Sequence, residues 1–135
     1  MSKTMLIIED DVVSRDLLRL VFEFDGFHCI EADNGAMGLT MLEAQSFDVI
    51  ILDNAMPVMT GLEFLANLQR KPQQSDAPII MITGLLNAKV RENATKLVSY
   101  AIVEKPYDLS ELRSLVSQLP ERIPSLPQKS SLLTK

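Results

Sequence analysis

Three carboxylates in this 135-residue chain follow apolar runs that have the character of buried strands. Glu9 and Asp10 come directly after Met5–Ile8, and Asp53 closes the run Val49–Asp53. An acid just after a strand often serves only as a helix cap or a solvated turn residue. Three acids brought to one place repel one another, however, and a bound cation relieves that repulsion. Because carboxylates are hard oxygen ligands, the pattern suggests a Mg²⁺ site.

A hydroxyl and an ammonium group, from Thr83 and Lys105, follow two further apolar runs. Taken singly, Lys105 could form a salt bridge with Asp53, and Thr83 a local turn hydrogen bond. Together with a metal site completed by a backbone carbonyl near Ala55, these groups suit the transfer of a phosphoryl group onto a carboxylate. Asp53 would be the nucleophile. The metal and Lys105 would neutralise the phosphoryl oxygens, and Thr83 would donate a hydrogen bond to the product.

Short apolar runs alternate with helical patterns along the chain, which predicts five β-α units. The expected strands are Met5–Ile8, Phe27–Ala32, Val49–Asp53, Ile79–Thr83 and Ala101–Val103. Right-handed crossovers then give a flavodoxin-like, doubly wound, five-stranded parallel sheet with five helices and strand order 2-1-3-4-5. In that order the first and third strands are neighbours, so their carboxyl ends bring Glu9, Asp10 and Asp53 together.

The helices are expected from apolar spacing and from capping residues at their starts. The first should carry an amphipathic stripe made of Val13, Leu17, Leu20, Val21 and Phe24. A capping box at Thr60–Glu63 begins the third helix, Asn87 caps a weakly apolar fourth, and Asp108–Glu111 caps the fifth. Each cap follows a predicted strand and its loop, which supports the β-α alternation.

Composition restricts the class of protein. A 135-residue chain that is 47% hydrophobic fits one globular domain, placed at 1–119, and the Pro- and Ser-containing segment 120–135 is expected to be a tail or linker stub. The net charge of −5, without a Lys or Arg run, argues against nucleic-acid or membrane binding. No apolar run could span a bilayer or act as a signal peptide, so a cytoplasmic location is expected. Cys29, the single cysteine, is expected to be a buried packing residue.

Several of these features, in this order and spacing, resemble the receiver domain of two-component response regulators, of the chemotaxis-regulator type. They lie within residues 4–119 and are Glu9–Asp10, Asp53 with Met56–Pro57 and Gly61, Thr83–Gly84, and Lys105–Pro106. The resemblance implies that Asp53 accepts a phosphoryl group from a sensor histidine kinase or a histidine phosphotransfer protein, in a Mg²⁺-dependent reaction. Such a domain catalyses its own phosphorylation and dephosphorylation and has no separate substrate.

The resemblance also implies roles for the matching residues. Glu9, Asp10 and the Ala55 carbonyl would hold Mg²⁺ together with the acceptor. Thr83 would move toward the phosphoryl group, and the Lys105–Pro106 bond would be cis. Phosphorylation would then remodel the face formed by the fourth helix, the fifth strand and the fifth helix, where an effector protein or an output domain binds and where a phosphorylation-dependent homodimer could form.

The sequence departs from the receiver pattern in places that bear on signalling. Receivers commonly have an aromatic residue three positions before the lysine, and Ile102 stands there. Tyr100, two residues earlier and on the same strand face, could substitute for it as a switch. Ala55 and Leu85, each two residues after a site residue, flank the expected path of the attacking water. Their apolar side chains cannot orient water, which predicts a long-lived aspartyl phosphate.

Other folds that handle phosphate fit the sequence less well. A haloacid-dehalogenase-type phosphatase needs an acid two residues after its aspartate, where Ala55 stands. A flavodoxin would carry a phosphate-binding loop where acids follow the first strand, and no dinucleotide or P-loop motif is present. The alternative that stays open is a receiver-like domain that binds partners without phosphorylation. The sequence also leaves open whether this is a single-domain regulator or part of a longer protein.

The proposed role of the two flanking side chains can be tested by adding polar groups. We expect Ala55→Asn and Leu85→Glu to raise the rate of autodephosphorylation, because an amide or a carboxylate can orient the attacking water. The decay of phosphorylated protein after removal of the phosphodonor measures this rate. A rate that does not rise in either variant contradicts the interpretation.

Overall fold

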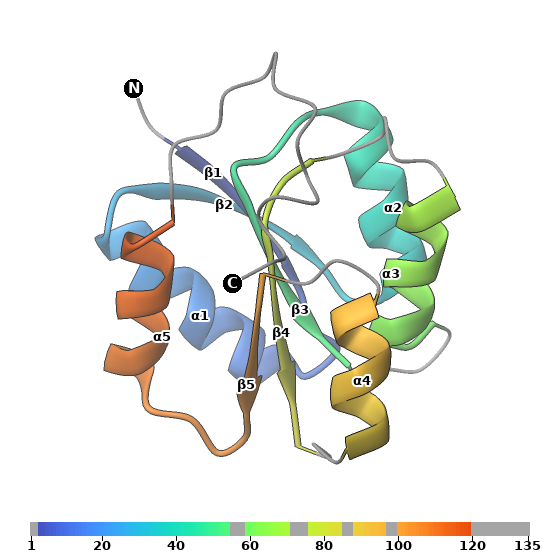
Figure 1. The fold of residues 1–135 in the computed structure, drawn as a ribbon. Coiled ribbons are helices and arrows are strands. Elements are labelled where there is room, and N and C mark those ends of the chain that lie inside the picture. Colours follow the sequence, from blue (N-terminus) through green and yellow to red (C-terminus); the bar gives the residue numbers. More distant parts are fainter. Residues whose placement is uncertain (1–2, 55–58, 71–75, 85–87, 97–99, 120–135) are drawn as a thin grey trace.

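The computed structural model describes residues 3–54, 59–70, 76–84, 88–96 and 100–119. Five parallel strands form one sheet in the order β2-β1-β3-β4-β5, with helices on both faces (Figure 1). The strands are β1 (Lys3–Ile8), β2 (Phe27–Ala32), β3 (Val49–Asp53), β4 (Ile79–Thr83) and β5 (Ala101–Glu104). The helices are α1 (Val12–Phe24), α2 (Gly35–Ala44), α3 (Gly61–Arg70), α4 (Ala88–Lys96) and α5 (Leu109–Ser117). The predicted flavodoxin-like fold and strand order are confirmed.

Strands β3 and β4 are apolar up to their last residues, Asp53 and Thr83, because both faces of the sheet are covered. All residues of β3 and β4 are buried. Side chains of β1 alternate between two cores: Leu6 and Ile8 pack on the side of α2 and α3, and Met5 and Ile7 on the side of α1 and α5. A sheet packed on both faces holds the residues that follow each strand in fixed positions.

Side chains satisfy the free N–H groups at the helix starts, as the capping pattern predicts. The Thr60 N–H donates to Glu63 Oε1 at 2.8 Å, and the Glu63 N–H donates to Thr60 Oγ1 at 3.1 Å, which is the reciprocal pair of a capping box. At α5, the carboxylate of Asp108 accepts hydrogen bonds from the N–H and the hydroxyl of Ser110. The predicted cap Asn87 lies outside the described residues.

The apolar stripe predicted for α1 is mostly not its buried face. The sheet-facing positions are instead Leu18 and Phe22, which are buried, with Val21 half-buried beside them. Four predicted stripe residues are exposed by 75%, 45%, 62% and 85%: Val13, Leu17, Leu20 and Phe24. Both sets have helical spacing, so the sequence pattern alone could not tell the core side from the solvent side. An exposed apolar stripe of this size on one helix suggests a contact surface.

The structure also bears on the predicted cis proline, the single cysteine and the expected absence of a membrane-spanning helix. The Lys105–Pro106 peptide bond is cis, as predicted. Cys29 is a buried free thiol, and burial raises its pKa to about 12, which makes it an inert packing residue. Among the described helices, none is long and apolar enough to cross a bilayer. The segment 120–135 lies outside the described residues, so its predicted role as a tail stays a prediction.

Candidate functional site

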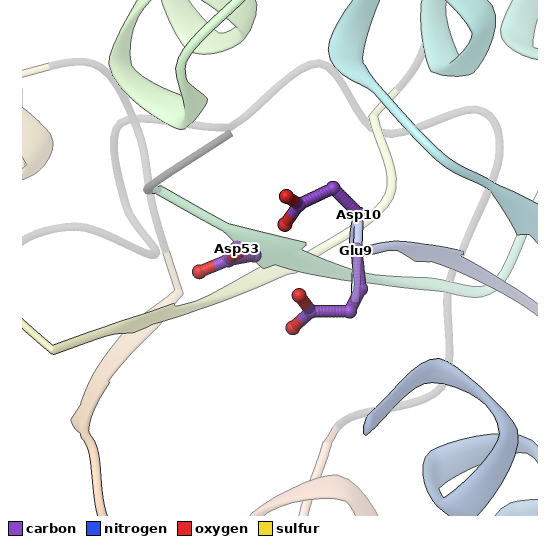
Figure 2. A group of neighbouring side chains, drawn as sticks. All are labelled: Glu9, Asp10 and Asp53. Atoms are coloured by element: carbon purple, nitrogen blue, oxygen red, sulfur yellow. The ribbon is translucent and has the colours of Figure 1, made fainter. Parts of the chain in front are cut away.

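The carboxyl ends of β1 and β3 bring the three predicted acids together. These strands are neighbours, with Ile8 opposite Leu52, so Glu9 and Asp10 leave β1 next to the position where Asp53 ends β3. One carboxylate oxygen from each of the three acids lies within 4.8 Å of the others. Figure 2 shows the three side chains extending to the same side of the strand ends. The predicted cluster is therefore present.

Two of these acids are withdrawn from water. Glu9 is 3% exposed and Asp53 is 2% exposed, whereas Asp10 is exposed. Buried carboxylates close to one another repel strongly unless a cation or a proton neutralises them. The donor set of buried and exposed carboxylate oxygens, with room for water on the Asp10 side, fits a hard divalent cation such as Mg²⁺.

Lys105 supplies one positive charge to the cluster. Its Nζ lies 3.3 Å from Asp53 Oδ1 and 3.6 Å from Glu9 Oε1. Partial burial works to lower the pKa of Lys105, but the charges of Asp53 and Glu9 outweigh it and the pKa is raised. One lysine supplies a single positive charge to three acids, so the site favours a further cation.

Glu9 is the acid of the cluster whose pKa is clearly raised. Burial raises the pKa of Glu9 to about 7, and the neighbouring Asp53 charge adds to the rise. The Asp11 N–H, which donates to Glu9 Oε2 at 3.1 Å, and the charge of Lys105 both oppose it. Glu9 therefore changes its protonation state near neutral pH.

Thr83 lies on β4, the strand next to β3, and Ile102 lies on β5, the strand next to β4. Thr83 is the last residue of β4 and is fully buried, and β4 pairs with β3 so that Asp53 lies opposite Ile82. Thr83 therefore ends its strand at the same edge as the acids. Ile102 of β5 is half-buried and packs against the core on the α2 and α3 side, and Tyr100 just before it is 39% exposed. The switch roles predicted for these residues stay predictions.

The remaining predicted site residues fall outside the described part of the chain. Ala55, with its carbonyl ligand and its place on the water path, and Leu85 are both in that group. What the sequence did not single out is Tyr107, half-buried directly after the cis proline. Burial raises the pKa of Tyr107, and the charge of Glu9 raises it further. Only its position after Lys-Pro could have signalled this.

The comparisons with known proteins agree with this geometry. A family model for the response regulator receiver domain matches residues 5–117. The chain is 31% identical over 119 residues to the probable transcriptional regulator ycf29 of Pyropia yezoensis, a match that covers 88% of this chain and 54% of that protein. The chain thus spans about half the length of the first curated relatives it matches.

Two solved structures extend the comparison to the fold. The chemotaxis protein CheY4 of Vibrio cholerae superposes with a TM-score of 0.82 at 24% identity, covering 89% of this chain and all of that one (100%). The response regulator TrrA of Thermotoga maritima, solved in complex with Mg²⁺-BeF, superposes with a TM-score of 0.75 at 28% identity, covering 87% and 99% of the two chains. The chain belongs to the response regulator receiver domain family, and so to two-component signal transduction.

The raised pKa of Glu9 predicts that any Mg²⁺ held by these acids binds in a pH-dependent way. Mg²⁺ and a proton compete for the same carboxylate, so affinity should increase as pH rises through about 7. If one proton is displaced, the dissociation constant should fall by about tenfold between roughly pH 6 and pH 8. Calorimetric titration of the full chain with MgCl₂ at constant ionic strength measures this, and Glu9→Gln should remove the pH dependence. An affinity that is constant over this range contradicts the assignment.

Without metal, the folding stability of the protein should fall as pH rises, whereas Mg²⁺ affinity should increase. The pKa of Glu9 is higher in the folded chain, about 7, than the ordinary value of 4.5, so the folded state binds the proton more tightly. The contribution of Glu9 to folding stability is then fully present below pH 4.5 and is lost as pH rises through about 7. Urea unfolding of wild type and Glu9→Gln without metal isolates this contribution.

Proposed function

We propose that Asp53 is the residue that accepts the phosphoryl group. The observation that supports this most directly is the convergence of Asp53 with Glu9, Asp10 and Lys105 at one edge of the sheet. An Asp53 carboxylate oxygen would attack phosphorus, forming the acyl phosphate, while the bond from phosphorus to the donor nitrogen breaks and its electron pair stays with the donor. Burial keeps bulk water away from the acceptor.

The other residues would stabilise the transferred group. Glu9, Asp10, Asp53 and the carbonyl of Ala55 would hold Mg²⁺, which when bound neutralises charge on the phosphoryl oxygens. Lys105 would leave its present contact with Asp53 Oδ1 and pair with the phosphoryl group instead. Thr83, at the end of the adjoining strand, would donate a hydrogen bond to one of its oxygens.

The phosphorylated domain would signal through the face made by α4, β5 and α5. Ile102 is part of β5, and Thr83 is buried at the end of the neighbouring strand β4. A new negative charge at Asp53 would change how these residues pack. An effector protein, an output domain elsewhere in a longer chain, or a second copy would read that change. A cytoplasmic location is part of the proposal and suits a chain whose cysteine, Cys29, is a free thiol.

The phosphodonor protein should dock on the exposed stripe of α1. The stripe starts at Val13, two residues after the Asp11 cap and three after the metal-binding Asp10, and runs to Phe24. These positions span about 16 Å along the helix axis. A protein that brings a phosphohistidine to Asp53 has to cover this rim of the site, and the apolar stripe offers it a continuous dry contact.

Asp53→Asn should abolish phosphorylation of the full chain by acetyl phosphate and Mg²⁺, because an amide oxygen cannot form the acyl phosphate. Intact-protein mass spectrometry measures the added phosphoryl group. The matched control is Asp48→Asn, which changes the same residue type just before β3, where the Thr4 N–H donates to Asp48 Oδ2. Labelling that persists in Asp53→Asn would refute the acceptor. Failure of wild type to bind beryllofluoride with Mg²⁺ would favour phosphorylation-independent partner binding.

Leu17→Lys and Leu20→Lys should slow transfer from a phosphorylated histidine kinase or phosphotransfer protein that labels wild type, by at least about tenfold. Their rates with acetyl phosphate should not change, because this small donor needs no protein surface. Met37→Lys is the matched control, since Met37 is an exposed apolar residue on α2. Equal loss of rate with both donors, or no loss with the protein donor, would count against α1 as the docking surface.

A further inference from the structure

A forked arginine ties the backbone of the metal-binding turn to the edge strand. Arg15, in the first turns of α1, donates from Nη1 to the carbonyl oxygen of Glu9 at 2.7 Å. Its Nε donates to Glu31 Oε1 of β2 at 2.8 Å. One planar guanidinium thus bridges β2 and the peptide that joins Glu9 to Asp10.

The Glu9 carbonyl lies beyond the last hydrogen-bonded pair of β1 and β2. The last paired residues of β1 and β2 are Ile8 and Ala32, and the Glu9 N–H donates to the Ala32 carbonyl at 3.0 Å. The Glu9 carbonyl lies just past the end of that ladder, where the chain turns toward α1. The Arg15 fork therefore supplies the hydrogen bond that continued strand pairing would have given.

The fork is itself held in place. The side chains of Arg15 and Glu31 are only 15% and 25% exposed, so their ion pair is partly shielded from solvent. Arg19, one turn along α1, brings its Nε to 2.6 Å from Glu31 Oε2. That contact is a close ion pair without hydrogen-bond geometry. Arg19 therefore attracts Glu31 by its charge alone, whereas Arg15 also holds Glu31 by a directed hydrogen bond.

We propose that Arg15, anchored by Glu31, is a positioning residue for the Mg²⁺ site, which it serves by fixing the orientation of the peptide between Glu9 and Asp10. Rotation of that peptide would swing the Asp10 carboxylate away from Glu9 and Asp53. The inference rests on the proposed metal site and concerns a residue that does not touch the metal. Residues that orient metal ligands in this way typically change metal affinity by tenfold or more.

A role through charge alone and a role in positioning predict opposite changes in Mg²⁺ affinity when Arg15 is removed. The direction of the change therefore tests the proposal. A cation beside an acidic cluster repels Mg²⁺, so if Arg15 acted only through its charge, Arg15→Met would tighten Mg²⁺ binding. If it positions the peptide, Arg15→Met should weaken binding by about tenfold despite the lost repulsion. Arg15→Lys separates the two further, because it keeps the charge but cannot form the fork.

The experiment is a calorimetric Mg²⁺ titration of the full chain at about pH 8, where Glu9 is ionised. Arg15→Met and Arg15→Lys should each raise the dissociation constant about tenfold, and Glu31→Met should raise it by less. The double variant Arg15→Met with Glu31→Met should bind no more weakly than Arg15→Met alone, because Glu31 acts through Arg15. A fully additive double variant would overturn that coupling.

Arg113→Met provides the matched control. Arg113 forms a similar pair with Asp25, the residue that caps the other end of α1, at 2.6 Å and 2.8 Å. Its loss should leave the Mg²⁺ dissociation constant within about a factor of two of wild type, since this pair is remote from the metal-binding turn. Urea unfolding of each variant without metal checks that the compared chains are folded, and Arg15→Lys carries the test if Arg15→Met does not fold.

Phosphorylation kinetics separate positioning from general damage to the site. With acetyl phosphate as donor, the Arg15 variants should need about tenfold more Mg²⁺ for half-maximal rate but reach nearly the wild-type maximum. Tighter or unchanged Mg²⁺ binding in Arg15→Met, or wild-type binding in Arg15→Lys, would overturn the inference and leave the proposed function standing. Absence of Mg²⁺ binding in wild type would overturn both.

Discussion

Electrostatic repulsion among buried carboxylates is the constraint around which this receiver domain is arranged. Glu9 and Asp53 are almost fully buried at the ends of neighbouring strands, with Asp10 at the same edge. Such a group is tolerated when a cation or a proton offsets the repulsion and the surrounding packing keeps the carboxylates in place. Lys105 reduces the repulsion, and burial raises the pKa of Glu9, so that a proton can also relieve it near neutral pH. A metal ion at the same place would relieve it as well, as the proposed function requires.

The double layer of helices provides that rigidity. Because both faces of β1, β3 and β4 are packed, the ends of these strands cannot move independently, and the acids that follow them inherit fixed positions. The same packing withdraws Asp53 and Thr83 from water, which strengthens every electrostatic interaction between them and a bound group. The fold and the chemistry are thus coupled through burial.

Helix α1 serves three purposes from two opposite sides. Phe22 and Leu18 pack into the core, Arg15 points to the turn that carries Glu9, and the stripe that ends at Phe24 faces solvent. Because Arg15 and Leu18 are three residues apart, they lie on the same side of the helix, and core packing there also holds the contact between Arg15 and the Glu9 carbonyl in place. The exposed stripe is therefore fixed relative to the carboxylates that follow β1 and end β3.

The sequence by itself determined the strand order, the convergence of Glu9, Asp10 and Asp53, and the family, because buried parallel strands read as unbroken apolar runs and the acids follow them directly. It did not determine which side of α1 is buried, since Leu17 and Leu18 belong to stripes with the same helical spacing. Only the tertiary structure joined Arg15 to Glu31, 16 residues apart on different elements, and only burial set the pKa of Glu9. Those features depend on distances and solvent access that arise when the helices pack on the sheet.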